Sequence, residues 1–340
     1  MMRVALAVNR SDRYQSGFGG PDDEYEEFDS PETAAAIANT IESFGHTVDV
    51  LEADSTFPET LARGKYDFVF NIAEGLRGRC RESQVPAVAE MLGVAYSGSD
   101  AITLGVTLDK ELAKRVATGR VPMANGRLFK NPRKIDLTGL SFPLLVKPNA
   151  EGSSKGIRNT SRITEPEGAK ERIAALIDAY NGPVLAEEFL PGLECTVGVV
   201  GNDMPRVIGA MEIAPRNVPL EEFVYSLETK RDYLNQVDYH IPPRISPEVL
   251  KQIYKVAIDA YKALECRDFA RVDVRLDAMG KPRFLECNPL PGLSPVKGDL
   301  VILAKATGMT YRELIGEILD VSFARQGLLM QQRAELKCAS

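Results

Sequence analysis

Strands and helices alternate through the first hundred residues, and this alternation constrains the fold more than any other feature. A Ser30-Pro31 pair suits the start of a helix, because serine caps the first turn and proline fits it. The expected strands are 3–9, 47–51, 66–72 and the segment around 95–96, and the expected helices are 31–44, 57–63 and 84–92. Since helices alternate with the strands, the pattern predicts a parallel sheet covered on both faces.

The pattern of expected helices and strands changes to an α+β type after about residue 109. Helices are expected at 109–117, 165–180, 246–264, 297–307 and 310–325, and strands at 144–147, 184–188, 194–200, 206–213, 269–277 and 282–287. Two segments are predicted to be polar loops: 11–28, which is too hydrophilic for a core, and 215–243, which would form a lid over substrate. The expected organisation is an N-terminal α/β substrate domain (1–100), a central subdomain (101–183), a C-terminal subdomain with a metal site (184–325) and a tail (326–340).

Composition excludes several classes of protein. The chain has 26% charged and 44% hydrophobic residues, which indicates a folded protein, and its net charge of −7 argues against nucleic acid as a partner. A local basic pocket for a small phosphate remains compatible with that charge. No apolar run approaches the ~20 residues needed to cross a bilayer, so no membrane partner is expected. Five cysteines without a CxxC pair predict reduced thiols in a cytoplasmic protein, and two histidines make a histidine-based zinc site unfavourable.

The most informative segment is the pair of strands at 269–277 and 282–287. Alternation places Arg271 and Asp273 on one face of the first strand, and Glu286 and Asn288 on one face of the second. A tight turn would set Asp273 opposite the other two. Two carboxylates and an amide oxygen are ligands that Mg²⁺ prefers when phosphate oxygens complete its shell. A solvated hairpin face also explains alternating charge, but the trio together with Arg271 favours a metal–phosphate site.

Two further segments point to a nucleotide. Lys147 ends an apolar strand and precedes the small-residue loop 151–156, whose backbone amides could approach phosphate oxygens; this loop is not a Walker A motif. A charge at Lys147 needs a partner, and phosphate would supply one. Farther along, the strand 184–188 ends in two carboxylates and could read an adenine base, with Glu194 reaching ribose hydroxyls, although a simple hairpin explains this segment better when it is taken alone.

In this order, the segments resemble the ATP-grasp superfamily, and specifically the D-alanine–D-alanine ligase family. The resemblance covers about residues 3–320 and is strongest in Lys147-Pro…Glu151-Gly-Ser-Ser…Gly156, Glu187…Leu190…Glu194 and Arg271-Val-Asp273…Glu286-Cys-Asn288-Pro…Pro291-Gly292. It implies an ATP-grasp fold: an N-terminal parallel-sheet domain and two α+β subdomains that sandwich ATP.

The resemblance also implies a role for each matching residue. Lys110, Lys147 and Lys230 would contact the phosphates, with Ser153, Ser154 and the loop amides closing over them. Glu187 and the backbone around Leu190 would take adenine, and Glu194 the ribose. Asp273, Glu286 and Asn288 would hold two Mg²⁺ ions, with Mn²⁺ as an alternative, and Arg271 would stabilise the transferring phosphoryl group. The family phosphorylates one substrate's carboxylate, and a second substrate's amine attacks the acyl phosphate. A homodimer through the N-terminal domain is also implied.

The substrate side departs from the family pattern. Glu27 and Glu32 both remain candidates for the glutamate that holds the first substrate's amino group and acts with Ser153. The expected tyrosine after Lys230 is Arg231, and the small hydroxyl residue expected past Gly292 falls at or near Lys297. The family's His-Gly…Gly-Glu-Asp-Gly loop appears as Glu74-Gly-Leu-Arg-Gly-Arg-Cys-Arg-Glu82.

The added positive charges bear on the substrate. Arg77, Arg79, Arg81, Arg231 and Lys297 suggest a larger substrate, or one with more carboxylate than alanine, because guanidinium groups suit carboxylates. The sequence thus predicts an ATP-dependent carboxylate–amine ligase for amino-acid-like molecules, with the dipeptide ligase of peptidoglycan synthesis as the first reading. The alternatives are a ligase for other amino acids or for a biosynthetic intermediate, and a non-catalytic nucleotide-binding regulator.

Overall fold

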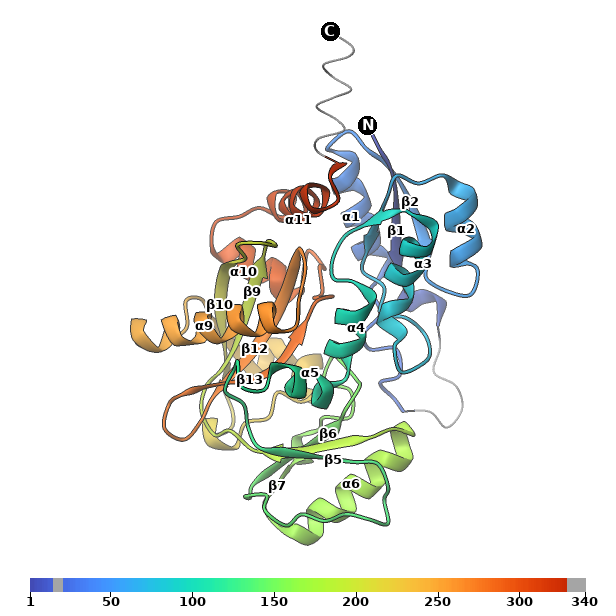
Figure 1. Ribbon diagram of the computed structural model, residues 1–340. Helices are drawn as coiled ribbons and strands as arrows, with labels where there is room; N and C mark the ends of the chain where they lie inside the picture. Colours follow the sequence, from blue (N-terminus) through green and yellow to red (C-terminus); the bar gives the residue numbers. More distant parts are fainter. Residues whose placement is uncertain (15–20, 329–340) are drawn as a thin grey trace.

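The computed structural model describes residues 1–14 and 21–328, which fold around three separate sheets (Figure 1). One sheet is parallel and two are antiparallel, so the expected fold class is confirmed. The predicted tail at 326–340 lies almost entirely outside the described residues. The domain boundaries at residues 100, 183 and 325 stay predictions.

The first sheet is parallel and has the strand order β2-β1-β3-β4. Its strands are β1 (Arg3–Val8), β2 (Thr47–Glu52), β3 (Phe68–Asn71) and β4 (Ala95–Tyr96). The helices of this part are η1 (Ser11–Arg13), α1 (Pro31–Glu42), α2 (Phe57–Gly64), η2 (Arg81–Ser83) and α3 (Gln84–Leu92). Ser30 caps α1 as predicted, since its Oγ accepts a hydrogen bond from the Thr33 amide at 3.2 Å.

The second sheet is antiparallel, has the order β5-β8-β6-β7 and lies at the bottom of Figure 1. Its elements are β5 (Gly126–Phe129), β6 (Leu144–Pro148), η3 (Asn159–Ser161), β7 (Arg162–Ile163), α6 (Pro166–Tyr180) and β8 (Val184–Glu188). Buried Ile173 and Leu176 of α6 pack in one core cluster with Leu144 and Val146 of β6. Strand β6 therefore has a buried apolar face as well as the buried lysine at its end.

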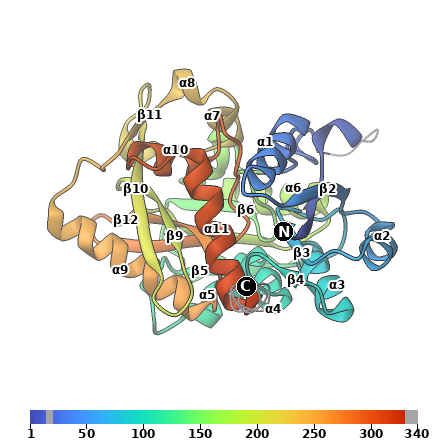
Figure 2. The same cartoon turned by 90° about the horizontal axis from the view of Figure 1, so that it is seen from above.

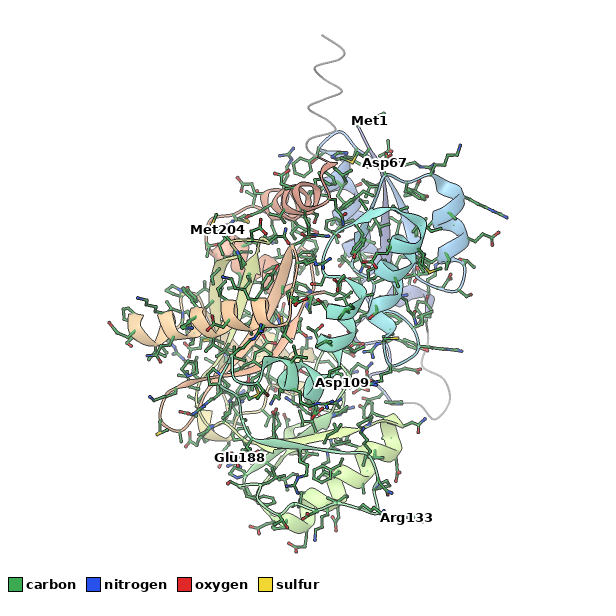
Figure 3. All side chains as sticks on the ribbon, viewed as in Figure 1. Met1, Asp67, Asp109, Arg133, Glu188 and Met204 are labelled. Carbon is green, nitrogen blue, oxygen red and sulfur yellow. The ribbon has the colours of Figure 1, made fainter. Side chains whose placement is uncertain are left out.

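Two helices join the first two sheets: α4 (Ala101–Leu108) and α5 (Lys110–Ala117). Only the second was expected from the sequence. Asp109 separates them, because its backbone is extended and its side chain caps α5 by accepting the Leu112 amide at 3.0 Å. Figure 3 shows Asp109 between the parallel sheet and the β5–β8 sheet.

The third sheet is antiparallel, with the order β11-β10-β9-β12-β13. Its strands are β9 (Glu194–Val200), β10 (Arg206–Pro215), β11 (Val237–His240), β12 (Phe269–Leu276) and β13 (Pro282–Asn288). The helices of this part are η4 (Leu220–Glu222), α7 (Leu227–Arg231), α8 (Tyr233–Gln236), α9 (Pro247–Ala263), α10 (Asp299–Ala306) and α11 (Tyr311–Arg325). In Figure 1, α9 and α10 lie on opposite sides of this sheet.

Helix α11, near the C-terminal end of the chain, packs against the parallel sheet of the N-terminal part. Its Leu314, Ile318 and Phe323 are buried in one cluster with Val4 and Phe68 of the parallel sheet. Figure 2 shows α11 running between the third sheet and the N-terminal part. No helix among the described residues is long and apolar enough to cross a membrane.

The prediction that two segments are polar loops is wrong in part. The segment 215–243 contains η4, α7, α8 and β11, and its Phe223 and Leu227 are buried, so it is largely structured. In the segment 11–28, Asp23 is buried, and Glu27 has a side chain that is only 3% exposed. Polar composition suggested exposure, but carboxylates are buried when distant segments supply their partners.

Candidate active site

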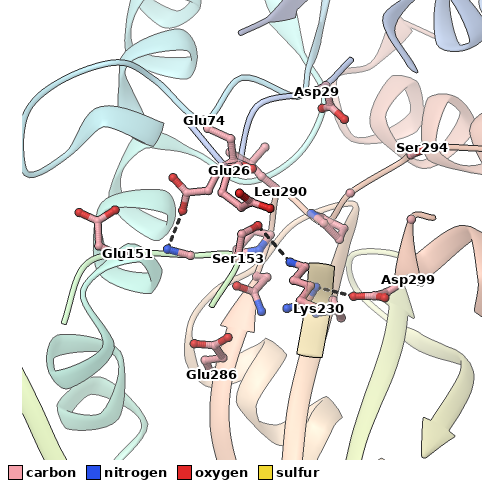
Figure 4. A pocket seen from close by; sticks show the side chains of 18 of the residues that line it. Glu26, Asp29, Glu74, Glu151, Ser153, Lys230, Glu286, Leu290, Ser294 and Asp299 are labelled. Carbon is pink, nitrogen blue, oxygen red and sulfur yellow. Dashed lines mark hydrogen bonds and ion pairs between the residues drawn. The ribbon is translucent and has the colours of Figure 1, made fainter. Parts of the chain in front are cut away.

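A cavity of about 340 Å³ brings together residues from all three parts of the fold (Figure 4). A smaller cavity of about 80 Å³ adjoins it and includes Lys147, Glu187, Leu190 and Glu194. The residues that line both cavities include Lys110, Ser153, Lys230, Arg271 and Glu286. The predicted nucleotide and metal residues therefore surround one continuous site.

The β12–β13 hairpin places the predicted metal ligands next to one another. Asp273 pairs with Glu286, and Arg271 pairs with Asn288, in the antiparallel register. The Asn288 Nδ2 group donates to Asp273 Oδ2 at 3.1 Å, and Glu286 Oε2 lies 3.2 Å from the Lys110 ammonium. Although burial raises the pKa of Glu286, Lys110, Lys147 and Arg271 hold it at about 2. This carboxylate is therefore ionised and available to a cation.

Arg271 is fixed by two carboxylates. Its Nε and Nη2 groups donate to Asp273, and its Nη1 donates to Asp299 Oδ2 at 2.8 Å. Sequence reasoning missed Asp299, whose only local signal is its place in the first turn of α10. The guanidinium is thus held rigidly at the wall shared by the two cavities.

The predicted phosphate loop has a left-handed backbone at Ser153, Ser154 and Gly156. A Cβ on Gly156 would lie 2.4 Å from Pro148, so glycine is required there. The Ser154 hydroxyl donates to the Tyr225 carbonyl at 3.0 Å, and the Lys230 ammonium donates to Ser153 Oγ at 3.1 Å. The loop is therefore tied to the segment that carries Lys230.

Glu27 and Glu32 occupy different environments. Glu27 lines the larger cavity, whereas Glu32 is exposed on α1 outside it, so the structure does not support Glu32 as a site residue. Glu27 accepts the Gly152 amide at 2.5 Å and pairs with Arg81 at 3.0 Å and Lys155 at 3.3 Å. Although burial raises its pKa, these cations lower it to about 2.

Glu187, which is predicted to contact adenine, is buried between two lysines. Its carboxylate contacts Lys114 through Oε2 and lies 2.5 Å from the Lys147 ammonium through Oε1. The partner that Lys147 requires is therefore Glu187 in this structure. Sequence reasoning missed Lys114, because a lysine on an amphipathic helix gives no sign of burial. Glu194, predicted to reach ribose, pairs with Arg275 at 3.1 Å.

Three of the arginines predicted to face the substrate form ion pairs with carboxylates of the protein. Arg231 lines the cavity but binds Glu26 at 2.7 Å and Asp22 at 3.3 Å. Arg81 binds Glu27, and Arg79 binds Asp109 at 3.0 Å. The prediction that these groups indicate a larger substrate, or one with more carboxylate than alanine, stays a prediction, and these three guanidinium groups already have partners in the protein. Two other predicted residues, Gly292 and Lys297, do line the cavity.

Three acidic side chains at the cavity have no hydrogen-bond or ion-pair partner among the described residues: Asp29, Glu74 and Glu82. Burial raises the pKa of Glu82 to about 8 and that of Asp29 to about 7, and it raises the pKa of Glu74 well above the usual range. Sequence reasoning did not name them as site residues, although Glu74 stands where the family pattern has histidine.

Comparisons with known proteins agree with this geometry. The family profile described as "D-ala D-ala ligase C-terminus" matches residues 125–320. The D-alanine–D-alanine ligase of Aquifex aeolicus is 31% identical, over 85% of this chain and 94% of its own. This chain belongs to the D-alanine–D-alanine ligase family. It is an ATP-dependent carboxylate–amine ligase of the D-alanine–D-alanine ligase type.

Other similar proteins extend the match over nearly the full chain. The uncharacterized protein y4sG of Sinorhizobium fredii is 31% identical, over 95% of this chain and 98% of its own. The ATP complex of the Bacillus anthracis D-alanine–D-alanine ligase has a TM-score of 0.75 at 19% identity, covering 96% of this chain and 99% of that chain. The VanG D-Ala:D-Ser ligase of Enterococcus faecalis has a TM-score of 0.71 at 20% identity, covering 94% and 99%. These two structures support the ATP-grasp fold.

Proposed function

We propose that this enzyme joins two amino acids, with D-alanine as the reference substrate, and that it serves peptidoglycan synthesis. ATP phosphorylates the carboxylate of the first amino acid, and the amine of the second attacks the acyl phosphate and displaces phosphate. The observation that carries the proposal is the single cavity at which Arg271, Lys230 and Glu286 meet the phosphate loop. A carboxylate does not react with an amine at neutral pH, so activation by phosphoryl transfer is the step that the site must support.

We propose Asp273, Glu286 and Asn288 as the ligands of magnesium. Their hard oxygen donors lie at adjacent positions of one ladder, so the donor set fits this ion. No group of three His, Cys, Asp or Glu side chains in residues 1–14 and 21–328 is arranged to hold a metal. Two carboxylates and an amide would therefore need phosphate oxygens to complete the coordination. Mg²⁺, as two ions or replaced by Mn²⁺, would neutralise charge on the phosphates.

The chain's own residues would position the reactants. Lys110, Lys147 and Lys230 would neutralise the phosphates, and Ser153 and Ser154 would donate hydrogen bonds to them. Arg271 would stabilise the charge of the transferring group, because its two carboxylate partners hold the guanidinium in place. Glu187 and the Leu190 backbone would contact adenine, and Glu194 would contact ribose. Arg231, Gly292 and Lys297 would border the amino-acid substrates.

The assembly and location are also proposals. We expect a homodimer through the N-terminal domain, where Met91 of α3 is 86% exposed. A cytoplasmic location is supported by the consumption of ATP and by the Cys266 and Cys287 thiols, which lie 3.5 Å apart without a disulfide.

The test is ADP release by the purified protein with Mg-ATP and single amino acids or pairs, in both enantiomers, with products identified by mass spectrometry. We expect amide products that require ATP and that are lost in Arg271→Lys and Asp273→Asn. ATP turnover without any amide product, or no turnover with any pair, would contradict the proposed function.

A further inference from the structure

We propose that the amino-acid end of the cavity recognises a cationic group, so that one substrate is an amino acid with a positively charged side chain. The recognising groups are the carboxylates of Glu82, Glu74 and Asp29. This inference rests on the proposed ligase function and names the class of substrate.

The first step is a comparison of the acidic side chains that line the larger cavity. Eight are present, and five of them form ion pairs with arginine or lysine. Asp29, Glu74 and Glu82 form none within the part of the chain that the structure describes. Their carboxyl groups remain available to a ligand, and a cationic group bound beside them would favour their ionised form.

Glu82 gives the strongest indication. It is 8% exposed, lies in η2 and lines the cavity, yet its carboxylate has no partner among residues 1–14 and 21–328. Burying a carboxylate without a partner is costly, and proteins satisfy such groups with ligands, water or protonation. An ammonium or guanidinium group of a substrate would supply the missing partner.

Two of the three carboxylates lie at one end of the site. Figure 4 shows Asp29 and Glu74 on the side of the cavity opposite Lys230 and Glu286. Glu82 lines the same cavity as Asp29 and Glu74, so one ligand in it can approach all three. A substrate carboxylate at the Lys230 and Arg271 end would leave a cationic side chain free to reach the acidic end.

Glu27, one of the two candidates for holding the first substrate's amino group, already has partners in the protein. Glu27 already receives hydrogen bonds from Gly152, Arg81 and Lys155. Its charge is therefore shared among groups of the protein, and it is less available to a ligand than Glu82. This assigns Glu27 a positioning role at the phosphate loop and leaves recognition of substrate cations to Asp29, Glu74 and Glu82.

The test compares amino acids that differ only by charge. Ornithine with norleucine, and lysine with 2-aminoheptanoic acid, form isosteric pairs, offered in both enantiomers with Mg-ATP. We expect kcat/KM to be about tenfold or more higher for the cationic member, because a hydrogen bond to a charged group contributes that much. Glu82→Gln and Asp29→Asn should remove most of this ratio. Glu171→Gln, an exposed site on α6, is the matched control.

A binding measurement separates the two proposals. The shift in melting temperature caused by ornithine or norleucine, with a non-hydrolysable ATP analogue present, needs no turnover. An ornithine-specific shift that Glu82→Gln abolishes supports the inference even if no amide forms. Equal rates and equal shifts for the two members of each pair, or a preference for glutamate, would overturn the inference while amide formation still supported the ligase. Absence of amide with every pair counts against the ligase alone.

Discussion

The backbone amide of Gly152 donates a 2.5 Å hydrogen bond to the carboxylate of Glu27, which lies 125 residues earlier in the chain. A Cβ added at Gly152 would lie 2.4 Å from the same oxygen, so this approach depends on glycine. The contact ties the phosphate loop to the N-terminal segment. Formation of the nucleotide site and of the amino-acid site is therefore coupled.

Glu27→Gln should destabilise the protein and loosen the phosphate loop. The side chains of Arg81 and Lys155 are 10% and 8% exposed, and breaking such buried ion pairs costs about 3 kcal/mol. Chemical denaturation and ATP titration would measure the effect. Glu26→Gln is the control, because Glu26 pairs with the more exposed Arg231 and should cost less than about 1 kcal/mol. Equal losses in both variants would contradict the anchoring role of Glu27.

Arg271→Lys should reduce turnover more than nucleotide affinity. Lysine cannot hold Asp273 and Asp299 at the same time, so the positive charge would move away from the transferring group. We expect kcat to fall about 100-fold or more with a small change in KM for ATP. Arg283→Lys removes a similar two-point contact to Asp277 at the other end of the hairpin, outside the cavities. A comparable loss in that variant would mean that the hairpin fold alone is responsible.

Glu187→Gln should leave two buried lysines without a counter-charge. Lys114 and Lys147 are 7% and 4% exposed, so we expect a loss of about 3 kcal/mol in the free energy of unfolding. Denaturant unfolding with and without ATP would check this, because ATP phosphates should restore part of the loss by binding Lys147. Glu188→Gln, on the opposite face of β8 with longer hydrogen bonds to Ser141 and Asn125, should change stability by less than about 1 kcal/mol. Unchanged stability in Glu187→Gln would show that these lysines are neutral.

The raised pKa of Asp29 predicts that the stability of the protein depends on pH. Burial raises its pKa to about 7, against the opposing charge of Lys297, while the carboxyl titrates near 3.8 when unfolded. The folded state therefore keeps a proton that the unfolded state loses, and the free energy of unfolding falls as pH rises from about 4 to 7. Asp29→Asn should reduce this fall in the free energy of unfolding by about 2 kcal/mol, with allowance for partial exposure. Denaturation of both proteins at pH 5 and pH 8 tests it, and identical slopes would count against a buried, proton-binding Asp29.

Local sequence periodicity was sufficient for much of the fold. The strand–helix alternation correctly predicted the parallel sheet, and two-residue alternation placed Asp273 opposite Glu286 because both strands belong to one hairpin. The site segments were recognised for the same reason, since each motif is short and contiguous. Segment 215–243 was misjudged because its few buried aromatic residues are separated by polar ones.

The pairing of charges was decided only by the tertiary structure. Arg81 and Arg231 appeared free for a substrate, but they bind Glu27 and Glu26, which lie 54 and 205 residues away in the chain. An ion pair depends on the distance between groups in space, and local periodicity carries no information about that distance. The sequence by itself therefore determined the strands, the hairpin and the kind of chemistry. The packing of distant segments determined which carboxylates are neutralised and which, like that of Glu82, remain open to a ligand.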